Sequence, residues 1–351
     1  MHNLIATALL LVLSTATAFA ARALGLPLPF LIGPLCISAL VATASPHRLP
    51  SGYRFPPPLR LAFVTIIGVA IGLQIRPELF ANTRALALSA AALTVFVVLA
   101  HGVGYAVLRG LGRYDRSTAF YAAAPGGLFE AIAMGEEAGA DPTRVTLQQF
   151  LRIIVVVTLL PIGLSLWYGA PVGSSAGMSL GASRVTLAGI GLAVAAGLTG
   201  IGLAHLLRFP AKQLTGPMAV AGVIALSGIY EPTLPQWLID TAQVVVGTAL
   251  GMRFKGLSVG LVMRSIWLTL LSVSGMLVLS AGFAALLADS LHQPFDVLLI
   301  SFAPGGVTEM SLVALSLASN PAFVTLHHVY RIVLTVVILA LTARLFRRTG
   351  S

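Results

Sequence analysis

The chain has 351 residues, of which 57% are hydrophobic and only 9% are charged, and its mean hydropathy is +0.95. A soluble domain carries about a quarter charged residues, so this composition excludes a water-exposed globular fold and predicts an all-α polytopic membrane protein. The net charge of +10 is spread over short loops, which argues against a nucleic-acid-binding domain, and the single Cys36 excludes intrachain disulfides and cysteine-based metal sites.

Twelve apolar segments follow one another along the chain. The first ends in Ala18-Phe19-Ala20, which is similar to a signal-peptidase site. Its basic start is weak and it has a counterpart deep inside the chain, so we expect it to remain as a membrane helix. The segments of the first half lie near 3–21, 29–45, 61–75, 85–108, 117–138 and 145–168. Those of the second half lie near 185–207, 214–230, 236–252, 265–287, 295–318 and 324–343.

The fifth segment of each half is interrupted by the sequence Ala-Pro-Gly-Gly, at 124–127 and again at 303–306. Proline removes a backbone donor and clashes with the preceding turn, and glycine weakens a helix further. The limbs on either side have about eight residues, or ~12 Å of helix, which reaches the middle of a bilayer without crossing it. We therefore expect each fifth segment to be a re-entrant hairpin that enters and leaves on one side.

The two halves are a tandem duplication. At an offset of 179 residues, eleven of the thirty positions from 124 to 153 are identical to their counterparts. Other markers recur as well: Gly68 and Gly72 match Gly247 and Gly251 at the same offset, and Pro27 and Gly33-Pro34 match Pro210 and Gly216-Pro217 at an offset of 183. We therefore predict a first membrane repeat at 1–168, a linker at 169–183 and a second membrane repeat at 184–348.

The basic residues favour one orientation of the repeats. If all twelve segments cross the membrane, both repeats face the same way and the basic loop residues divide 10 inside to 9 outside. If the fifth segments are hairpins, each repeat has about five crossings, the second repeat is inverted, and the division becomes 15 to 4. The positive-inside rule favours the inverted arrangement, which places both termini on the cytoplasmic side of a bacterial inner membrane. The four outside residues are then Arg22, Arg76, Arg84 and Arg184.

Four ionisable residues are expected inside the membrane, where such groups are costly and usually mark function. A glutamate follows each break by three residues, and an arginine lies in the last segment of each repeat. Two interpretations stay open. The glutamates and arginines form structural ion pairs, Glu130 with Arg152 and Glu309 with Arg331, or the arginines bind an anionic group while the glutamates titrate or bind a cation. The candidate substrate-binding residues are Pro125, Gly126, Gly127, Glu130, Arg152, Pro304, Gly305, Gly306, Glu309 and Arg331; no catalytic residue, metal ligand or cofactor is expected.

Inverted repeats with broken helices are typical of secondary transporters, whose half-helix ends present their dipoles to the substrate and the coupling ion. The free N–H groups at the start of each second limb favour an anion. The sequence therefore favours alternating-access transport of a small anionic or zwitterionic solute, with Na⁺ or H⁺ as a possible coupling ion.

The duplicated unit resembles the AbrB membrane family (AbrB duplication). The resemblance rests on Gly-Pro in the second segment, Gly-xxx-Gly in the third, and Ala-Pro-Gly-Gly-xx-Glu followed by Pro-xx-Val-Thr-Leu and arginine, and it covers nearly the whole chain. Members carry names such as regulator of aidB expression and, by old transfer, ammonia monooxygenase. The resemblance implies an integral membrane protein linked to the regulation of gene expression, and it supplies no substrate or site residues.

Three classes of function can be compared. A membrane-embedded regulator is the alternative to a transporter, but no extramembrane domain is expected to contact DNA directly, so its effect on expression would be indirect. An ammonia-oxidising enzyme would need a metal site, and the adjacent His327 and His328 point about 100° apart on a helix, so we expect no enzyme. Those histidines align with Gln148 and Gln149, where polar residues at the membrane interface are a sufficient explanation. The expected partners are the lipid bilayer and a small solute, and a homodimer is a possible assembly.

Overall fold

The computed structural model describes residues 2–26, 28–75, 77, 83–169, 187–207, 211–228, 234–257, 259–317 and 319–342. These residues form helices and connecting loops, and no strand occurs among them. Within this part of the chain, six helices are long and apolar enough to cross a membrane. The all-helical fold is thus that of a multi-pass membrane protein.

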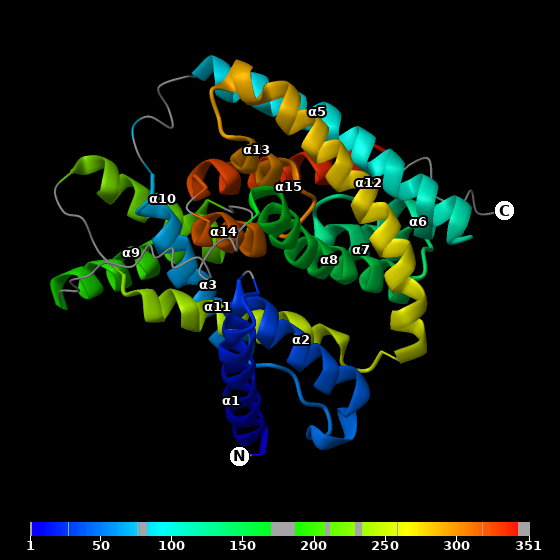
Figure 1. The fold of residues 1–351 in the computed structure, drawn as a ribbon, viewed down its shortest axis with the longest axis horizontal. Coiled ribbons are helices and arrows are strands. Elements are labelled where there is room, and N and C mark those ends of the chain that lie inside the picture. Colours follow the sequence, from blue (N-terminus) through cyan, green and yellow to red (C-terminus); the bar gives the residue numbers. More distant parts are fainter. Residues whose placement is uncertain are drawn as a thin grey trace. The chain divides into compact units, whose positions relative to one another are not determined.

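The helices of the first half follow the predicted apolar segments closely (Figure 1). Proline stands at the start of several of them, where its missing N–H group is not needed. In chain order they are α1 (His2–Ala23), α2 (Pro29–Ala44), the 3₁₀ turn η1 (Pro46–Arg48), α3 (Pro57–Gly72), α5 (Thr83–Ala106), the π-helical turn η2 (Val107–Leu111), α6 (Arg116–Ala122), α7 (Leu128–Glu137) and α8 (Pro142–Tyr168).

The described α-helices of the second half follow one another in the same order, while the short 3₁₀ and π-helical turns differ. Its longest helix has 33 residues and lies at the place of α5 in the first half. The elements are α9 (Leu187–Leu206), α10 (Lys212–Ser227), α11 (Gln236–Gly251), the 3₁₀ turn η4 (Met252–Phe254), α12 (Val259–Leu291), α13 (Phe295–Phe302), α14 (Val307–Ser316) and α15 (Pro321–Thr342).

Both fifth segments are broken where the sequence predicts. Residues 123–127 separate α6 from α7, and residues 303–306 separate α13 from α14. Gly127 has a φ of +60°, a left-handed conformation that glycine adopts without a steric penalty. The chain therefore leaves one short helix and starts the next within a few residues.

Four helices are shorter than the hydrocarbon core of a bilayer. The helices α2, α3, α10 and α11 have 16 residues each, which corresponds to ~24 Å of helix against a core of ~30 Å. The prediction of ten crossings counts all four, and it stays a prediction. The markers Pro27 and Pro210, nearly all of the predicted linker, and the basic residues Arg76, Arg184, Arg208, Arg344, Arg347 and Arg348 lie outside the described residues.

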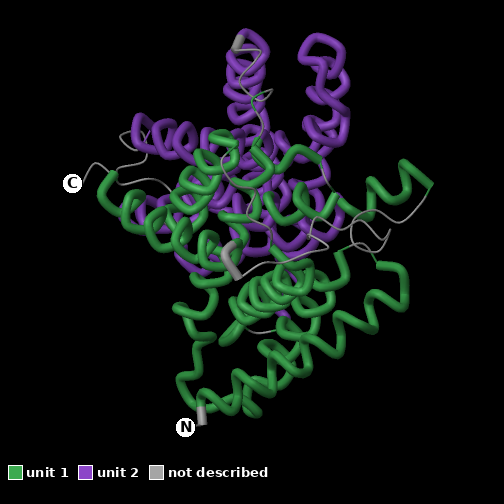
Figure 2. Tube along the Cα trace, turned by 90° about the vertical axis from the view of Figure 1, so that its left-hand side faces the viewer, with its two compact units in different colours: residues 1–81, 161–259, 311–322 green, residues 82–160, 260–310, 323–351 purple. Residues whose placement is uncertain are grey.

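The chain divides into two compact units, and each takes helices from both halves (Figure 2). Unit 1 comprises residues 1–81, 161–259 and 311–322, which include α1–α3 and α9–α11. Unit 2 comprises residues 82–160, 260–310 and 323–351, which include both helix breaks. The units therefore cut across the predicted repeats at 1–168 and 184–348, and those boundaries stay a prediction about the sequence duplication.

In unit 1, helices of one half pack directly on helices of the other: α2 on α11 and α3 on α10. Glycines make these close approaches possible. A Cβ atom added at Gly247 or Gly251 of α11 would lie 2.5 Å from the carbonyl oxygen of Leu31 or Leu35 of α2. Gly68 of α3 lies equally close to the backbone of α10. The Gly-xxx-Gly pairs are therefore packing faces.

In unit 2, the long helices α5 and α12 run side by side (Figure 1). Phe96 of α5 and Phe283 of α12 meet edge to face, with ring centroids 5.7 Å apart, and both rings contact Phe302 at the end of α13. A second apolar cluster surrounds the first break and includes Ala119, Tyr121 and Ala131. Both helix breaks and most of the helices α8 and α15 thus lie within one unit, while the later part of α14 belongs to unit 1.

Candidate functional site

The base of the first broken segment is fixed by side chains that cap helices. Asp115 precedes α6 and accepts a hydrogen bond from the backbone N–H of Thr118 (2.9 Å), which satisfies a free donor of the first turn. Thr118 in turn accepts from the N–H of Asp141 (2.8 Å), and Ser117 donates to the carbonyl of Ala138 (3.0 Å). These bonds hold the start of α6 against the end of α7, so the two limbs leave from one place.

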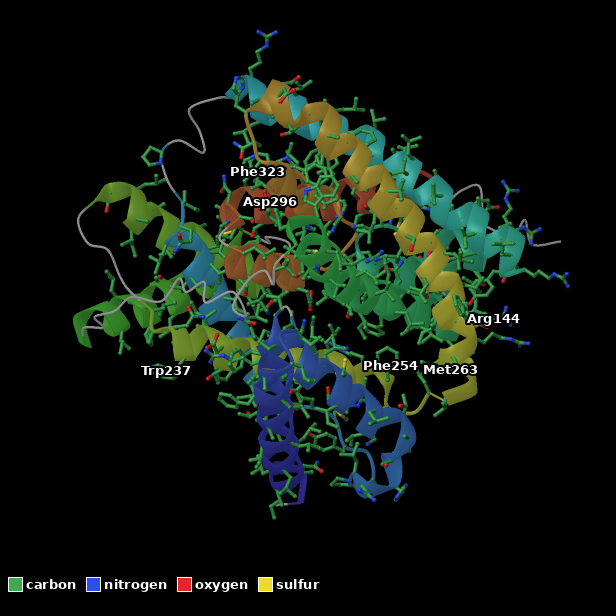
Figure 3. The ribbon with its side chains drawn as sticks, viewed as in Figure 1. Arg144, Trp237, Phe254, Met263, Asp296 and Phe323 are labelled. Atoms are coloured by element: carbon green, nitrogen blue, oxygen red, sulfur yellow. The ribbon has the colours of Figure 1, made fainter. Side chains whose placement is uncertain are left out.

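Asp141 also caps α8, which carries the first buried arginine. Its carboxylate accepts from the N–H groups of Thr143 and Arg144 (3.0 and 3.1 Å). Arg144, whose position is labelled in Figure 3, returns an ion pair to Asp141 (3.2 Å) and lies 5.0 Å above the ring of Tyr114. The start of α8 is thereby anchored at the base of the hairpin.

The broken end of α6 is satisfied by two side chains of α8. The last carbonyl groups of a helix have no partner within the helix, and inside a membrane no bulk water can replace it. The amide nitrogen Nε2 of Gln149 lies 3.0–3.3 Å from the carbonyl oxygens of Tyr121, Ala122 and Ala124. Arg152 donates from Nη1 to the carbonyl of Ala124.

The broken end of α13 is satisfied in the same way by α15. Arg331 donates from Nη1 to the carbonyl of Ala303 and from Nη2 to the carbonyl of Gly305 (2.6 Å). His328 lies 3.0 Å from the carbonyl of Ile300 through Nε2, and its Nδ1 lies 2.6 Å from Nη2 of Arg331. Since a carbonyl only accepts, Nε2 carries the proton and Nδ1 accepts from the arginine. Ile300 is the counterpart of Tyr121 at the 179-residue offset.

The structural ion pairs, one of the two interpretations that the sequence leaves open, are not found among the described residues. Among the described residues, neither Arg152 nor Arg331 lies within 4.0 Å of a carboxylate, and the ion pair found there is Arg144 with Asp141. The physical reason is the polarity of the broken helices. The cationic side chains go to the negative, carbonyl-rich ends of α6 and α13, while Glu130 and Glu309 lie in the first turns of α7 and α14, at the positive ends.

Each glutamate folds back over the last glycine of its break. A Cβ atom added at Gly306 would collide with Oε2 of Glu309, and one added at Gly127 would lie 3.5 Å from Oε2 of Glu130. Glu309 is buried, with 5% of its surface exposed, whereas Glu130 is exposed. The two equivalent carboxylates therefore have the same local position and different access to solvent.

The tip of each break lies against the last helix of the other half. A Cβ atom added at Gly126 would lie 3.0 Å from Oγ1 of Thr335, and one added at Gly127 would lie 3.2 Å from Val336, both on α15. At Gly306 it would lie 3.5 Å from Ile153 of α8, the neighbour of Arg152. The structure thus gathers Pro125, Gly126, Gly127, Glu130, Arg152, Pro304, Gly305, Gly306, Glu309 and Arg331 within unit 2.

Several buried polar atoms around the breaks lack a partner in the described part of the chain. They are Nε of Arg152, Nε of Arg331, Oε1 of Gln149 and Oγ1 of Thr335. The two arginines are 5% and 1% exposed. A buried charge without a counter-charge is expensive, so this region favours a negatively charged group from outside the chain.

Sequence reasoning underestimated the polar residues next to the arginines. Gln148, Gln149, His327 and His328 are all buried inside the protein. Gln148 accepts from Thr269 of α12 (2.7 Å). His327 contacts Ser89 of α5 (3.0 Å), and its ring lies 4.1 Å from that of Phe323, which is labelled in Figure 3. The available signal was their pairing at the 179-residue offset, directly upstream of both arginines.

Comparison with known proteins covers most of the chain. Residues 40–347 match the family described as "Transition state regulatory protein AbrB". The chain is 26% identical over 322 residues to "Putative regulator AbrB" of Escherichia coli K12, which covers 87% of this chain and 86% of that protein. It is 24% identical over 356 residues to "Uncharacterized protein YhjN" of Bacillus subtilis 168, which covers 96% and 92% of the two chains.

Proposed function

Because this chain belongs to the AbrB family and has the helices of a multi-pass membrane protein, we propose that it is a secondary transporter of a small anionic or zwitterionic solute. The observation that carries the proposal is the pair of buried arginines, Arg152 and Arg331, which lie at the two helix breaks without an acidic partner among the described residues. A bound carboxylate or phosphate would supply the missing counter-charge.

The chemistry of the region fits a solute with both signs of charge as well as a plain anion. The free Nε atoms of the arginines are donors, whereas Oε1 of Gln149 is a free acceptor and Glu309 is a buried carboxylate. Acceptors of this kind suit the ammonium group of a zwitterion or a coupling ion such as Na⁺ or H⁺. The ten candidate residues around the breaks would line this site, and no catalytic chemistry or cofactor is part of the proposal.

The proposed architecture is a pair of inverted repeats, each with about five crossings and one re-entrant hairpin. Backbone geometry supports the duplication: Leu28 and Ala211, equivalent at an offset of 183, both have a φ of 49°, and Arg113 and His292, equivalent at 179, both have a φ of 51°. Positive φ is uncommon outside glycine, so its recurrence at equivalent positions favours a common backbone plan. Alternating access would follow from movement of one set of helices about the site.

A second candidate is a membrane-embedded regulator of gene expression, which rests on the name of the Escherichia coli relative. Such a protein would act indirectly, through a solute or a partner, because the chain consists largely of membrane-type helices. In both cases we propose a multi-pass protein of the bacterial inner membrane with both termini in the cytoplasm. A homodimer is a possible assembly.

Transport is tested by uptake into vesicles that contain the purified full-length protein. Labelled acetate, succinate, glutamate, glycine and inorganic phosphate serve as probes, each with and without a Na⁺ or H⁺ gradient. We expect at least one probe to accumulate above the level in protein-free vesicles. Equal, background uptake of all probes under every gradient would contradict the transporter and favour the regulator.

A further inference from the structure

The two equivalent arginines are bound to their surroundings in different ways. Arg331 uses Nη1 for Ala303, and its Nη2 bonds both Gly305 and His328. Since each Nη atom carries two hydrogens, Nη2 of Arg331 is fully occupied. Arg152 has one hydrogen-bond partner among the described residues, the carbonyl of Ala124, which it reaches through Nη1.

The difference comes from the residue that precedes each arginine by three positions. In the first half this residue is Gln149, whose amide group reaches three carbonyls at the end of α6. In the second half it is His328, whose one N–H group reaches Ile300 only. The ring of His328 and the carbonyl of Gly305 thus engage Nη2 of Arg331. In the first half Gln149 and Arg152 share the carbonyl of Ala124, and Nη2 of Arg152 has no partner among the described residues.

On this basis, which rests on the proposed function, we infer that Arg152 is the residue that binds the oxyanion of the solute, through its Nε and Nη2 edge, while Arg331 holds the second hairpin closed. Nε and Nη2 point to the same side of the guanidinium and match two oxygens of a carboxylate or phosphate. Arg152 as a whole is 5% exposed, and its Nε is buried without a partner in the part of the chain that is described.

The surroundings of Arg152 favour the same assignment. A Cβ atom added at Gly126, two residues after the carbonyl that Arg152 binds, would lie 3.4 Å from the backbone oxygen of Arg331, so an oxyanion on Arg152 adds negative charge to a region that holds two buried arginines. The next residue, Ile153, contacts Gly306 at the tip of the second break. A solute held by Arg152 is therefore placed beside both hairpins, and binding can be coupled to their movement.

The test compares Lys substitutions, which keep the charge but remove the two-pronged edge. The full-length protein in detergent is unfolded by heat in chloride, acetate, succinate or inorganic phosphate at equal ionic strength. A ligand that binds only the folded protein raises the Tm. We expect at least one oxyanion to raise the Tm of the wild type above its value in chloride, and this rise to disappear in Arg152→Lys.

Two further variants make the result specific. Arg144→Lys, an exposed arginine on the same helix, is the matched control and should keep the full oxyanion effect. Arg331→Lys should start from a lower Tm because it loses hairpin contacts, but should still be stabilised by the same oxyanion. An oxyanion effect that persists in Arg152→Lys, or an absence of any effect in the wild type, would overturn the inference.

The uptake assay separates this inference from the proposed function. If the wild type takes up a probe and Arg152→Lys takes it up equally well, the assignment of Arg152 is overturned and transport still stands. Stabilisation of the wild type that is lost in Arg152→Lys, combined with background uptake of every probe, would leave the binding residue standing and contradict transport.

Discussion

Arg152 and Arg331 donate hydrogen bonds to the carbonyl groups at two buried helix ends, a role that water has at exposed helix ends. The carbonyls that end α6 and α13 receive bonds from one cationic and one neutral side chain on the neighbouring long helix. A positive group also suits the negative end of the helix dipole. This explains how a chain can carry a Pro-Gly-Gly break in an apolar setting, and why each break is followed by an arginine at the same distance.

His328 is the counterpart of Gln149, so glutamine is the natural replacement to test at position 328. In His328→Gln the amide group is expected to reach the carbonyl of Ile300, as Gln149 reaches that of Tyr121. In His328→Leu the carbonyl of Ile300 loses this partner in a buried site, which costs about 1–3 kcal/mol. We therefore expect thermal unfolding in detergent to show a Tm near the wild type for His328→Gln and a clearly lower Tm for His328→Leu.

The reciprocal change provides the control. Gln149→His should lower the Tm, because a single imidazole N–H cannot serve the three carbonyls that the amide group reaches. If His328→Gln and His328→Leu were equally unstable, the hydrogen bond to Ile300 would not be what fixes this residue.

At the scale of helices, glycine residues set the distance between helices of unit 1 that come from different halves of the chain. Gly247 brings α11 so close to α2 that a methyl group would lie 2.5 Å from a carbonyl oxygen. The helices must separate to accept Gly247→Ala, and such overpacking costs about 1–3 kcal/mol. We expect a lower Tm in detergent for Gly247→Ala, and likewise for Gly68→Ala at the equivalent contact of α3 with α10.

A glycine-to-alanine substitution at a position with open space around it should not lower the Tm. Gly202 lies in α9, and no atom lies within 4 Å of the position that a Cβ atom would take. Alanine favours a helix over glycine by about 1 kcal/mol, so Gly202→Ala should leave the Tm unchanged or raise it. Equal loss of stability in Gly202→Ala and Gly247→Ala would show that helix packing is not the cause.

The sequence predicted these elements well because the signals are local. Apolar runs marked the helices, and Pro-Gly-Gly marked both breaks. The sequence could not decide between an ion pair of Glu130 with Arg152 and its alternative, because the unpaired carbonyls at Tyr121 and Ala124 are a property of the folded backbone that no side-chain pattern displays. The pairing of α2 with α11 and of α3 with α10 was likewise not predictable, since it joins residues from different halves.

Within the whole molecule, neither half of the chain builds a compact unit alone. Unit 1 takes α1–α3 from one half and α9–α11 from the other, and unit 2 takes one helix break from each. The glycine contacts in unit 1 and the contacts of the break tips with α8 and α15 in unit 2 all join one half to the other. Each compact unit is thus built from both halves of the chain.

The proposed inversion of the repeats can be tested at two equivalent turns. Arg113 and His292 are separated by 179 residues, are both exposed and share a φ of 51°. In inverted repeats the two turns face opposite sides of the membrane, whereas in parallel repeats they face the same side. In a Cys36→Ser background, a membrane-impermeant maleimide added to spheroplasts should label His292→Cys at once and Arg113→Cys only after the membrane is opened.

The basic residues are the reason for this expectation. Arg113 belongs to the group Arg109, Arg113 and Arg116 at the start of the first hairpin, whereas the turn at His292 has no lysine or arginine within six residues on either side. Lysine and arginine near short loops are retained in the cytoplasm, so the first turn should stay inside and the second should be free to lie outside.

A third variant, Thr143→Cys at the other end of the first hairpin, should behave like Arg113→Cys if the hairpin enters and leaves on one side. Labelling of Thr143→Cys in intact spheroplasts would mean that the fifth segment crosses the membrane, and labelling of both turns from one side would mean that the repeats are parallel.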